Sequence, residues 1–135
     1  MRLRTLLPAF ALTASLSLAA CGSDDSTVTA EEGSTPEQAI TEIGAVRTAL
    51  DNALDAVRSG DKAQADEILS EGYVEHFEKV EGPLEDVDEE LNEQLEETLA
   101  KDIRAKVNAG APAGEVAELV DAAKADLVTA ESKLK

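Results

Sequence analysis

The chain has 135 residues, of which 29 are Asp or Glu and 12 are Lys or Arg, so its formal net charge is −17. One domain is expected at this length. Such acidity excludes nucleic acid as a partner, and it suits either solubility at a membrane surface or attraction of cations or a basic protein.

The N-terminal segment predicts a bacterial lipoprotein signal peptide over residues 1–20. Arg2 and Arg4 form a positive n-region, and residues 6–18 form an apolar h-region. The Leu-Ala-Ala-Cys stretch that ends at Cys21 resembles the lipobox, in which a signal peptidase cuts before the cysteine and the cysteine is lipidated. We therefore expect Cys21 to carry acyl chains such as palmitate and to take no part in a disulfide or in catalysis.

This anchor predicts an extracytoplasmic location in the cell envelope, at the outer face of the cytoplasmic membrane or at the outer membrane. Residues 1–20 contain two arginines and no acid, so their removal changes the formal charge from −17 to −19. No later run approaches the ~20 apolar residues that span a bilayer. Residues 21–35, which are rich in Gly, Ser and Thr after the cysteine, predict a flexible linker of about 20 Å.

Residues 36–135 predict an all-α fold, an up-down-up-down four-helix bundle. The first helix is expected from the Thr35 N-cap and the Gln38 capping-box residue to about residue 58, where Ser59-Gly60 ends it. Its apolar residues recur at helical spacing, and they are Ile40, Ile43, Val46, Leu50, Leu54 and Val57.

The second helix is expected over residues 61–80, capped by Asp61 with Gln64, and Gly82-Pro83 is expected to break the chain. One face of this helix is apolar and comprises Ala65, Leu69, Tyr73, Phe77 and Val80.

A capping box at Asp86 and Glu89 predicts the third helix, over residues 87–108. Its apolar residues are Val87, Leu91, Leu95, Leu99, Ile103 and Val107. A spacing of four drifts by about 40° per step, so the buried face must rotate or the helix must wrap its neighbours. The fourth helix is expected over residues 113–134. Short connections favour a bundle, and two dimerising helical hairpins are the alternative.

The chain has one histidine, His76, which a helical wheel places in the middle of the buried face of the second helix. Three interpretations are open: a neutral histidine bonded to a carboxylate or to the backbone, a metal ligand, or a pH switch. Glu71, Glu75 and Glu78 form an acidic ridge at i, i+4, i+7 spacing. That ridge is either a solvated face or a surface site for a hard cation.

Level-matching along the bundle places Arg47, Glu71, Glu96 and Asp126 in roughly one layer. Such a layer predicts an ion pair between Arg47 and a carboxylate, or a carboxylate cluster that takes a cation. Signatures of catalysis are missing, because the chain has no Gly-rich phosphate loop, no GxSxG and no Cys-x-x-Cys. A di-iron bundle needs two Glu-x-x-His pairs, and Tyr73 stands three residues before His76. We therefore do not expect an enzyme.

The run Tyr73–Leu84, followed by Leu95–Leu99 and Lys106–Gly110, resembles the extracytoplasmic (periplasmic) helical domain of bacterial iron permeases. In that domain an aromatic-Glu-x-x-Glu stretch ends one helix and a Glu-x-x-apolar stretch opens the core of the next. A basic residue, a Gly turn and a helix rich in Ala and Leu follow. The resemblance covers about residues 39–134, and the matching residues are Phe77, Glu78, Glu81, Glu96 and Gly110.

The chain departs from these permeases because it lacks their membrane helices and the intramembrane Arg-Glu-x-x-Glu motif that defines transport. The resemblance therefore implies a free-standing, lipid-anchored accessory protein that binds or presents iron (Fe²⁺ or Fe³⁺) or another divalent cation. It also implies docking to an iron permease or another transport component.

The expected metal ligands are Glu78, Glu81 and Glu96, with His76 and Glu75 added from the residue pattern. Glu78 points outward on the helical wheel, which suits a surface site or a partner contact. The alternative function is an acidic helical interaction module that docks a basic envelope partner without metal.

Overall fold

The computed structural model describes residues 33–135, which belong to one compact unit. The expected signal peptide over residues 1–20, the lipidated Cys21 and most of the 21–35 linker lie outside the described residues. Residues 33–135 are helical and contain no strand, so the all-α prediction is confirmed. No helix among them is long and apolar enough to cross a membrane.

The first helix, α1, runs over Pro36–Ser59 and begins as its sequence predicts. The Thr35 side chain accepts a hydrogen bond from the Gln38 N–H at 3.3 Å, and Gln38 Oε1 accepts one from the Thr35 N–H at 2.8 Å. Gly60 ends α1 with φ at 85°, a left-handed conformation that glycine adopts readily. These short-range hydrogen bonds fix both ends of α1.

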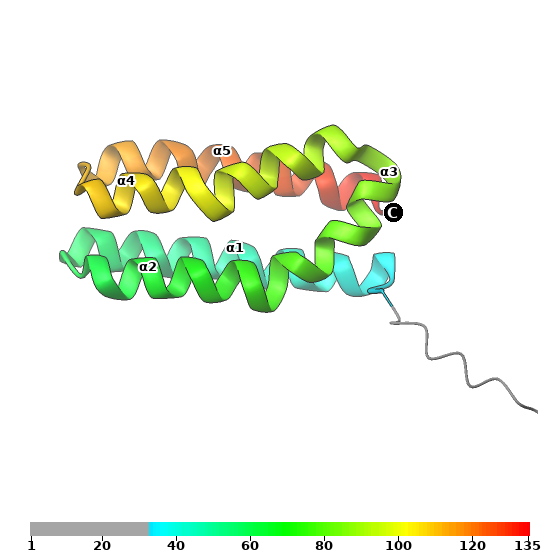
Figure 1. Ribbon diagram of the computed structural model, residues 1–135, viewed down its shortest axis with the longest axis horizontal. Coiled ribbons are helices and arrows are strands. Elements are labelled where there is room, and N and C mark those ends of the chain that lie inside the picture. The colour runs from blue at the N-terminus through cyan, green and yellow to red at the C-terminus, as the bar shows by residue number, and fades with distance from the viewer. Residues whose placement is uncertain (1–32) are drawn as a thin grey trace, which may run out of the picture. The chain divides into compact units, whose positions relative to one another are not determined.

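The chain from residue 62 to residue 109 is helical apart from a kink at Asp88. It comprises α2 (Lys62–Glu71), η1 (Gly72–Phe77), α3 (Glu78–Glu97), η2 (Thr98–Asp102) and α4 (Ile103–Ala109). Its direction changes at Asp88, where the backbone is extended at φ −161° and ψ 82°. Figure 1 shows this stretch running along α1, reversing within α3 and returning beside α5 (Ala113–Lys133).

The expected break at Gly82-Pro83 is wrong, because α3 continues through both residues. Pro83 and Leu84 are buried there, so core packing offsets the hydrogen bond that proline removes. The reversal comes later, where the Asp88 carboxylate accepts a hydrogen bond from the Leu91 N–H at 3.1 Å. Asp88 therefore caps the returning segment in place of the expected Asp86 and Glu89 pair. Val87, expected in the core, is 51% exposed beside this reversal.

Two wide π-helical turns, η1 and η2, resolve the drift that a spacing of four produces. From Leu91 to Val107 the drift would reach about 160°, which would carry the last residues out of the core. A turn with i→i+5 bonding accommodates one extra residue and so resets the face by about 100°. Within the repeat around η2, Leu95, Leu99, Ile103 and Val107 are all buried. The same spacing leads from Ala65 through η1 to Phe77.

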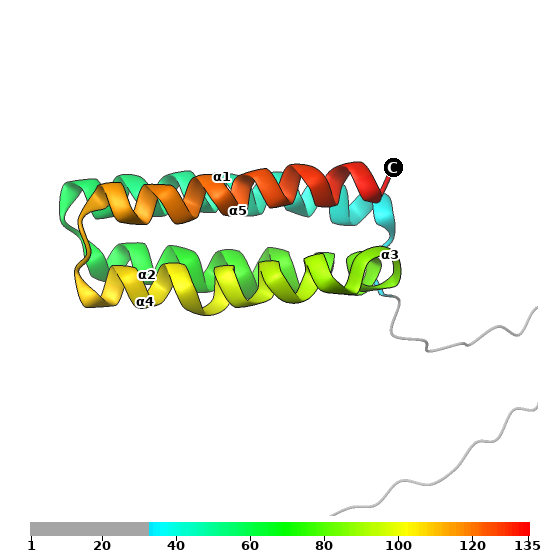
Figure 2. The same ribbon diagram turned by 90° about the horizontal axis from the view of Figure 1, so that it is seen from above.

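The helices enclose an aliphatic core in which Phe77 is the one fully buried aromatic side chain among the described residues. Contacts join α1 to α2, to α3 and to α5, and they join α4 to α2 and to α5. The connections from α1 to α2 and from α4 to α5 lie at one end, and the C-terminus lies at the other (Figure 2). Within the described residues the core extends from Ala39 to Leu134, so this part of the chain has a hydrophobic core of its own.

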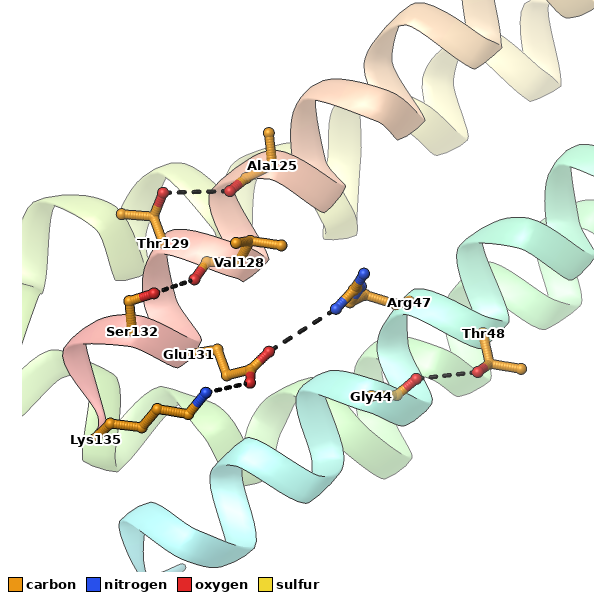
Figure 3. Close-up of polar contacts among 9 residues, drawn as sticks. All are labelled: Gly44, Arg47, Thr48, Ala125, Val128, Thr129, Glu131, Ser132 and Lys135. Carbon is orange, nitrogen blue, oxygen red and sulfur yellow. Dashed lines mark hydrogen bonds and ion pairs between the residues drawn. The ribbon is translucent and has the colours of Figure 1, made fainter.

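Salt bridges between helices supplement the core. Arg47 on α1 points towards Glu131 on α5, with 3.8 Å between the guanidinium and the carboxylate, and Lys135 also reaches Glu131 at 2.8 Å (Figure 3). Arg104 Nε on α4 lies 2.8 Å from Asp66 Oδ1 on α2, and Lys133 lies 2.7 Å from Asp88. These pairs involve every helical stretch, although pairs this exposed contribute little to stability.

Candidate functional site

His76 lies in η1 and bonds to a carboxylate on another helix. Its Nδ1 lies 2.6 Å from Glu42 Oε2 on α1, and Lys79 Nζ lies 3.2 Å from the other oxygen of the same carboxylate. The hydrogen bond from His76, followed by that from Lys79, holds the pKa of Glu42 below its usual value against the opposing effect of burial. His76 therefore takes a carboxylate partner, as one of the three open interpretations predicted.

The expected burial of His76 is wrong, because its side chain is 33% exposed. The wide turn η1 explains the difference, since a wheel drawn at 100° per residue no longer holds across it. Its neighbour Glu75 is exposed and shares the wall of a surface groove with His76.

Tyr73 contacts one of the three glutamates that the resemblance implies and lies within electrostatic range of the other two. Its phenol donates a hydrogen bond to Glu81 Oε1 at 2.5 Å, and its ring packs on Phe77 with centroids 5.6 Å apart. Burial raises the pKa of Tyr73, and the hydrogen bond to Glu81 and the negative charges of Glu81, Glu96 and Glu78 raise it further. Glu78, Glu81 and Glu96 therefore all lie within electrostatic reach of one phenol.

The Tyr73 group consists of Tyr73, Glu78, Glu81 and Glu96. Glu81 and Glu96 are half-buried and Glu78 is exposed, so the group opens to solvent on one side. It draws on η1 and on the segments of α3 before and after the reversal at Asp88. Its oxygen ligands suit hard cations. Within residues 33–135, however, no three His, Cys, Asp or Glu side chains lie close enough together to hold a metal ion.

The five expected ligands thus separate into two places. Glu81 accepts a hydrogen bond from Tyr73, and Glu78 and Glu96 act on Tyr73 at longer range, whereas His76 and Glu75 line the groove beside α1. Sequence reasoning missed Tyr73 because it treated the residue as core, and it missed Glu42 because no pattern links α1 to residue 76. One signal was available for Tyr73: it is the single tyrosine of the chain.

The expected layer of Arg47, Glu71, Glu96 and Asp126 does not describe how Arg47 is paired. Arg47 pairs with Glu131, which lies outside that layer. Asp126 accepts a hydrogen bond from Gln94 Nε2 at 2.8 Å, and Glu71 lines the groove between α1 and α2. The ion pair expected for Arg47 is therefore present, with a different carboxylate.

Comparison of the chain with models of known protein families, with curated proteins and with solved structures finds no match.

Proposed function

We propose that this chain is a lipid-anchored protein of the cell envelope that binds a hard cation, iron first, and presents it to a metal-uptake system. Cys21 would carry the lipid, and the 21–35 linker would join it to a helical unit that functions as a four-helix bundle. In that bundle the segments on either side of Asp88 act as two separate helices. The direct recipient would be an iron permease or another transport component.

The observation that supports cation binding is the hydrogen bond from the Tyr73 phenol to Glu81, with Glu78 and Glu96 near enough to act on the same phenol electrostatically. Four oxygen donors of two kinds suit Fe³⁺, and the carboxylates also suit Fe²⁺ and other hard divalent cations. A cation bound there would replace the proton that Tyr73 donates to Glu81. Because glutamate side chains are long and this group is open on one side, Glu78 and Glu96 can rotate inward when a cation supplies the compensating charge.

Residues 33–135 contain no preassembled cluster of metal ligands, and this lowers the affinity that we expect for the cation. Bringing carboxylates together before the cation arrives costs electrostatic energy, so the free protein keeps them apart. Binding should therefore be reversible and moderate in affinity, as suits a protein that passes its cation on.

The single tyrosine makes the test direct, because the chain has one Tyr and no Trp, so its intrinsic emission comes from Tyr73. Residues 22–135 would be titrated with Fe²⁺ under anaerobic conditions and with chelated Fe³⁺, over a background of Mg²⁺ and Ca²⁺. Calorimetry would give the binding stoichiometry. A change in Tyr73 emission would show that the cation binds near Tyr73. An Fe³⁺–phenolate bond also absorbs visible light, so Tyr73→Phe should abolish that absorption.

Two triple variants with equal charge separate a site from a general acidic surface. The variant Glu78→Gln/Glu81→Gln/Glu96→Gln should lose saturable binding. The control exchanges three exposed glutamates elsewhere on α3 and comprises Glu89→Gln, Glu90→Gln and Glu93→Gln. The control should keep the affinity within about threefold, since it changes only the long-range field. Equal loss in both variants would reject the Tyr73 group as a site.

A further inference from the structure

A groove follows α1 beside α2 and η1, and none of the four residues of the Tyr73 group lines it. Its first part has a volume of about 440 Å³ and lies between α1 residues 45–52 and residues 68–76 of α2 and η1. A second part, of about 430 Å³, shares Asn52 and Ile68 with the first and extends to Ser59. Together they follow α1 from residue 45 to residue 59, which is about 21 Å of helix.

The groove exists because the two helices meet through their smallest residues. A Cβ on Gly72 would lie only 2.7 Å from the Ala49 Cβ, so η1 and α1 approach closely at this point. Small side chains on the adjacent α1 positions Ala45 and Thr48 leave the flank of this contact unfilled, and half-buried Ile68 adds an apolar surface. This is the shape that receives a helix with an apolar face.

The rim of the groove on the α2 side carries unpaired negative charge. Glu71 and Glu75 line the groove, and Glu67 stands four residues before Glu71. The ridge along this groove consists of Glu67, Glu71 and Glu75, without Glu78. Like charges at i, i+4 destabilise a helix, so this ridge opposes folding. Within residues 33–135 none of the three has a Lys, Arg or His nitrogen within 4.0 Å.

Several other acids close to these three glutamates are paired with basic side chains, so those basic residues are already engaged. Asp66, next to Glu67, is paired with Arg104, and Glu42 is paired with His76 and Lys79. At the far end of the groove Asp55 is paired with Arg58 at 3.0 Å. A basic partner could therefore neutralise the ridge without displacing an existing ion pair.

We propose that this groove docks an amphipathic helix of a partner protein, about 14 residues long, with a small apolar face and Lys or Arg along one flank. The apolar face would cover Ala45, Ala49 and Ile68, and the basic flank would meet Glu67, Glu71 and Glu75. A second copy of this chain would place acid against acid, and an anionic bilayer would be repelled in the same way. The proposal does not depend on cation binding, because the Tyr73 group shares no residue with the groove.

The test uses a designed peptide of about 15 residues, with Ala and Leu on one face and Lys on the flank, labelled for fluorescence anisotropy. A second peptide of the same composition has its order permuted, so that it keeps the charge and loses the apolar face. Both are titrated into residues 22–135 in the presence of a metal chelator, so that the result is independent of cation binding.

Matched protein variants then locate the binding. Glu67→Gln/Glu71→Gln/Glu75→Gln and, separately, Asn52→Trp, which fills the junction of the two groove parts, should each weaken the designed peptide about tenfold or more. The control variant Glu89→Gln/Glu90→Gln/Glu93→Gln loses the same formal charge and should change the affinity by less than about threefold. Circular dichroism spectra should show that all three variants remain folded.

Three outcomes would overturn the proposal. If the two triple variants weakened the binding of the designed peptide equally, the peptide would recognise only the net charge of the protein. Equal binding of the permuted peptide would mean that no apolar face is recognised. Unchanged binding to Asn52→Trp would place the peptide outside the groove.

Discussion

Replacing Gly72 with alanine tests the close approach of η1 to α1, on which both the core and the groove depend. The added Cβ would lie 2.7 Å from the Ala49 Cβ. Apolar carbons are in favourable contact at about 3.5–4.0 Å, so the two helices must separate by about 1 Å. The separation would loosen the packing of Val46, Leu50 and Leu69, which line a small internal cavity against Gly72.

The size of the effect follows from two opposing contributions. Alanine favours a helix over glycine by about 1 kcal/mol, whereas overpacking a well-packed contact costs about 1–3 kcal/mol. Gly44 supplies the control, because it also lies within a helix and a Cβ there would meet nothing within 4 Å. Gly44→Ala should therefore stabilise the protein by about 0.5–1 kcal/mol, and Gly72→Ala should be about 1–3 kcal/mol less stable than Gly44→Ala.

The assay is urea unfolding of residues 22–135 followed by far-ultraviolet circular dichroism. Each kcal/mol should also move the Tm by about 4–8 °C in a domain of this size. The double variant Ala49→Gly/Gly72→Ala exchanges the two residues across the contact and should recover most of the lost stability. The reasoning is refuted if Gly72→Ala stabilises as much as Gly44→Ala does, or if the double variant recovers nothing.

Three further predictions concern polar groups. Asn92 is 6% exposed, and its Oδ1 has no hydrogen-bond partner among residues 33–135. Asn92→Leu should therefore raise the free energy of unfolding, measured in urea, by about 1 kcal/mol. A lower free energy of unfolding would show that Oδ1 has a hydrogen-bond partner. Asp88→Ala removes the N-cap at the reversal and should lower the free energy of unfolding by about 1 kcal/mol. Asp88→Asn can still accept the hydrogen bond and should retain most of this stability. Equal losses of stability in thermal melts of the two variants would contradict capping. The lowered pKa of Glu42 means that its stabilising effect is present above its unfolded-state pKa of about 4.3 and is lost as pH falls through the folded value. Glu42→Gln should therefore show a shallower loss of stability below about pH 4, and an unchanged pH profile would contradict this linkage.

Local signals in the sequence predicted both ends of α1. Thr35 and Gln38 act within one turn, and Gly60 needs only its own backbone conformation, so neither depends on tertiary contacts. Pro83 shows the limit of such signals, because burial of Pro83 and Leu84 outweighs the local preference for a break. The choice of Asp88 over Asp86 as the cap depends on where the chain must turn to bring Leu91 and Leu95 onto the core.

The candidate site was predictable in its residue types more than in its geometry. A carboxylate partner was one of several interpretations open for His76. Glu42 lies 34 residues away on another helix, and spacing within one helix cannot identify it. The three glutamates were expected to act together, but their common neighbour Tyr73 was assigned to the core. The spacing of four predicts a rotating buried face or a helix that wraps its neighbours. The wide turns that reset the face instead depend on packing against the other helices.

The wide turn η1 also determines how the side chains after it are rotated about the helix axis relative to those before it. Because η1 holds one residue more than regular turns would, everything after Phe77 is turned by about 100° relative to everything before Gly72. Deleting one residue from η1 would leave a regular helix of almost the same length. It would also rotate Val80 and Leu84 off the core and swing Glu81 away from Tyr73. Gly72, Glu75 and His76 of η1 also line the groove, so a single-residue length change here would alter the groove and the carboxylate group together.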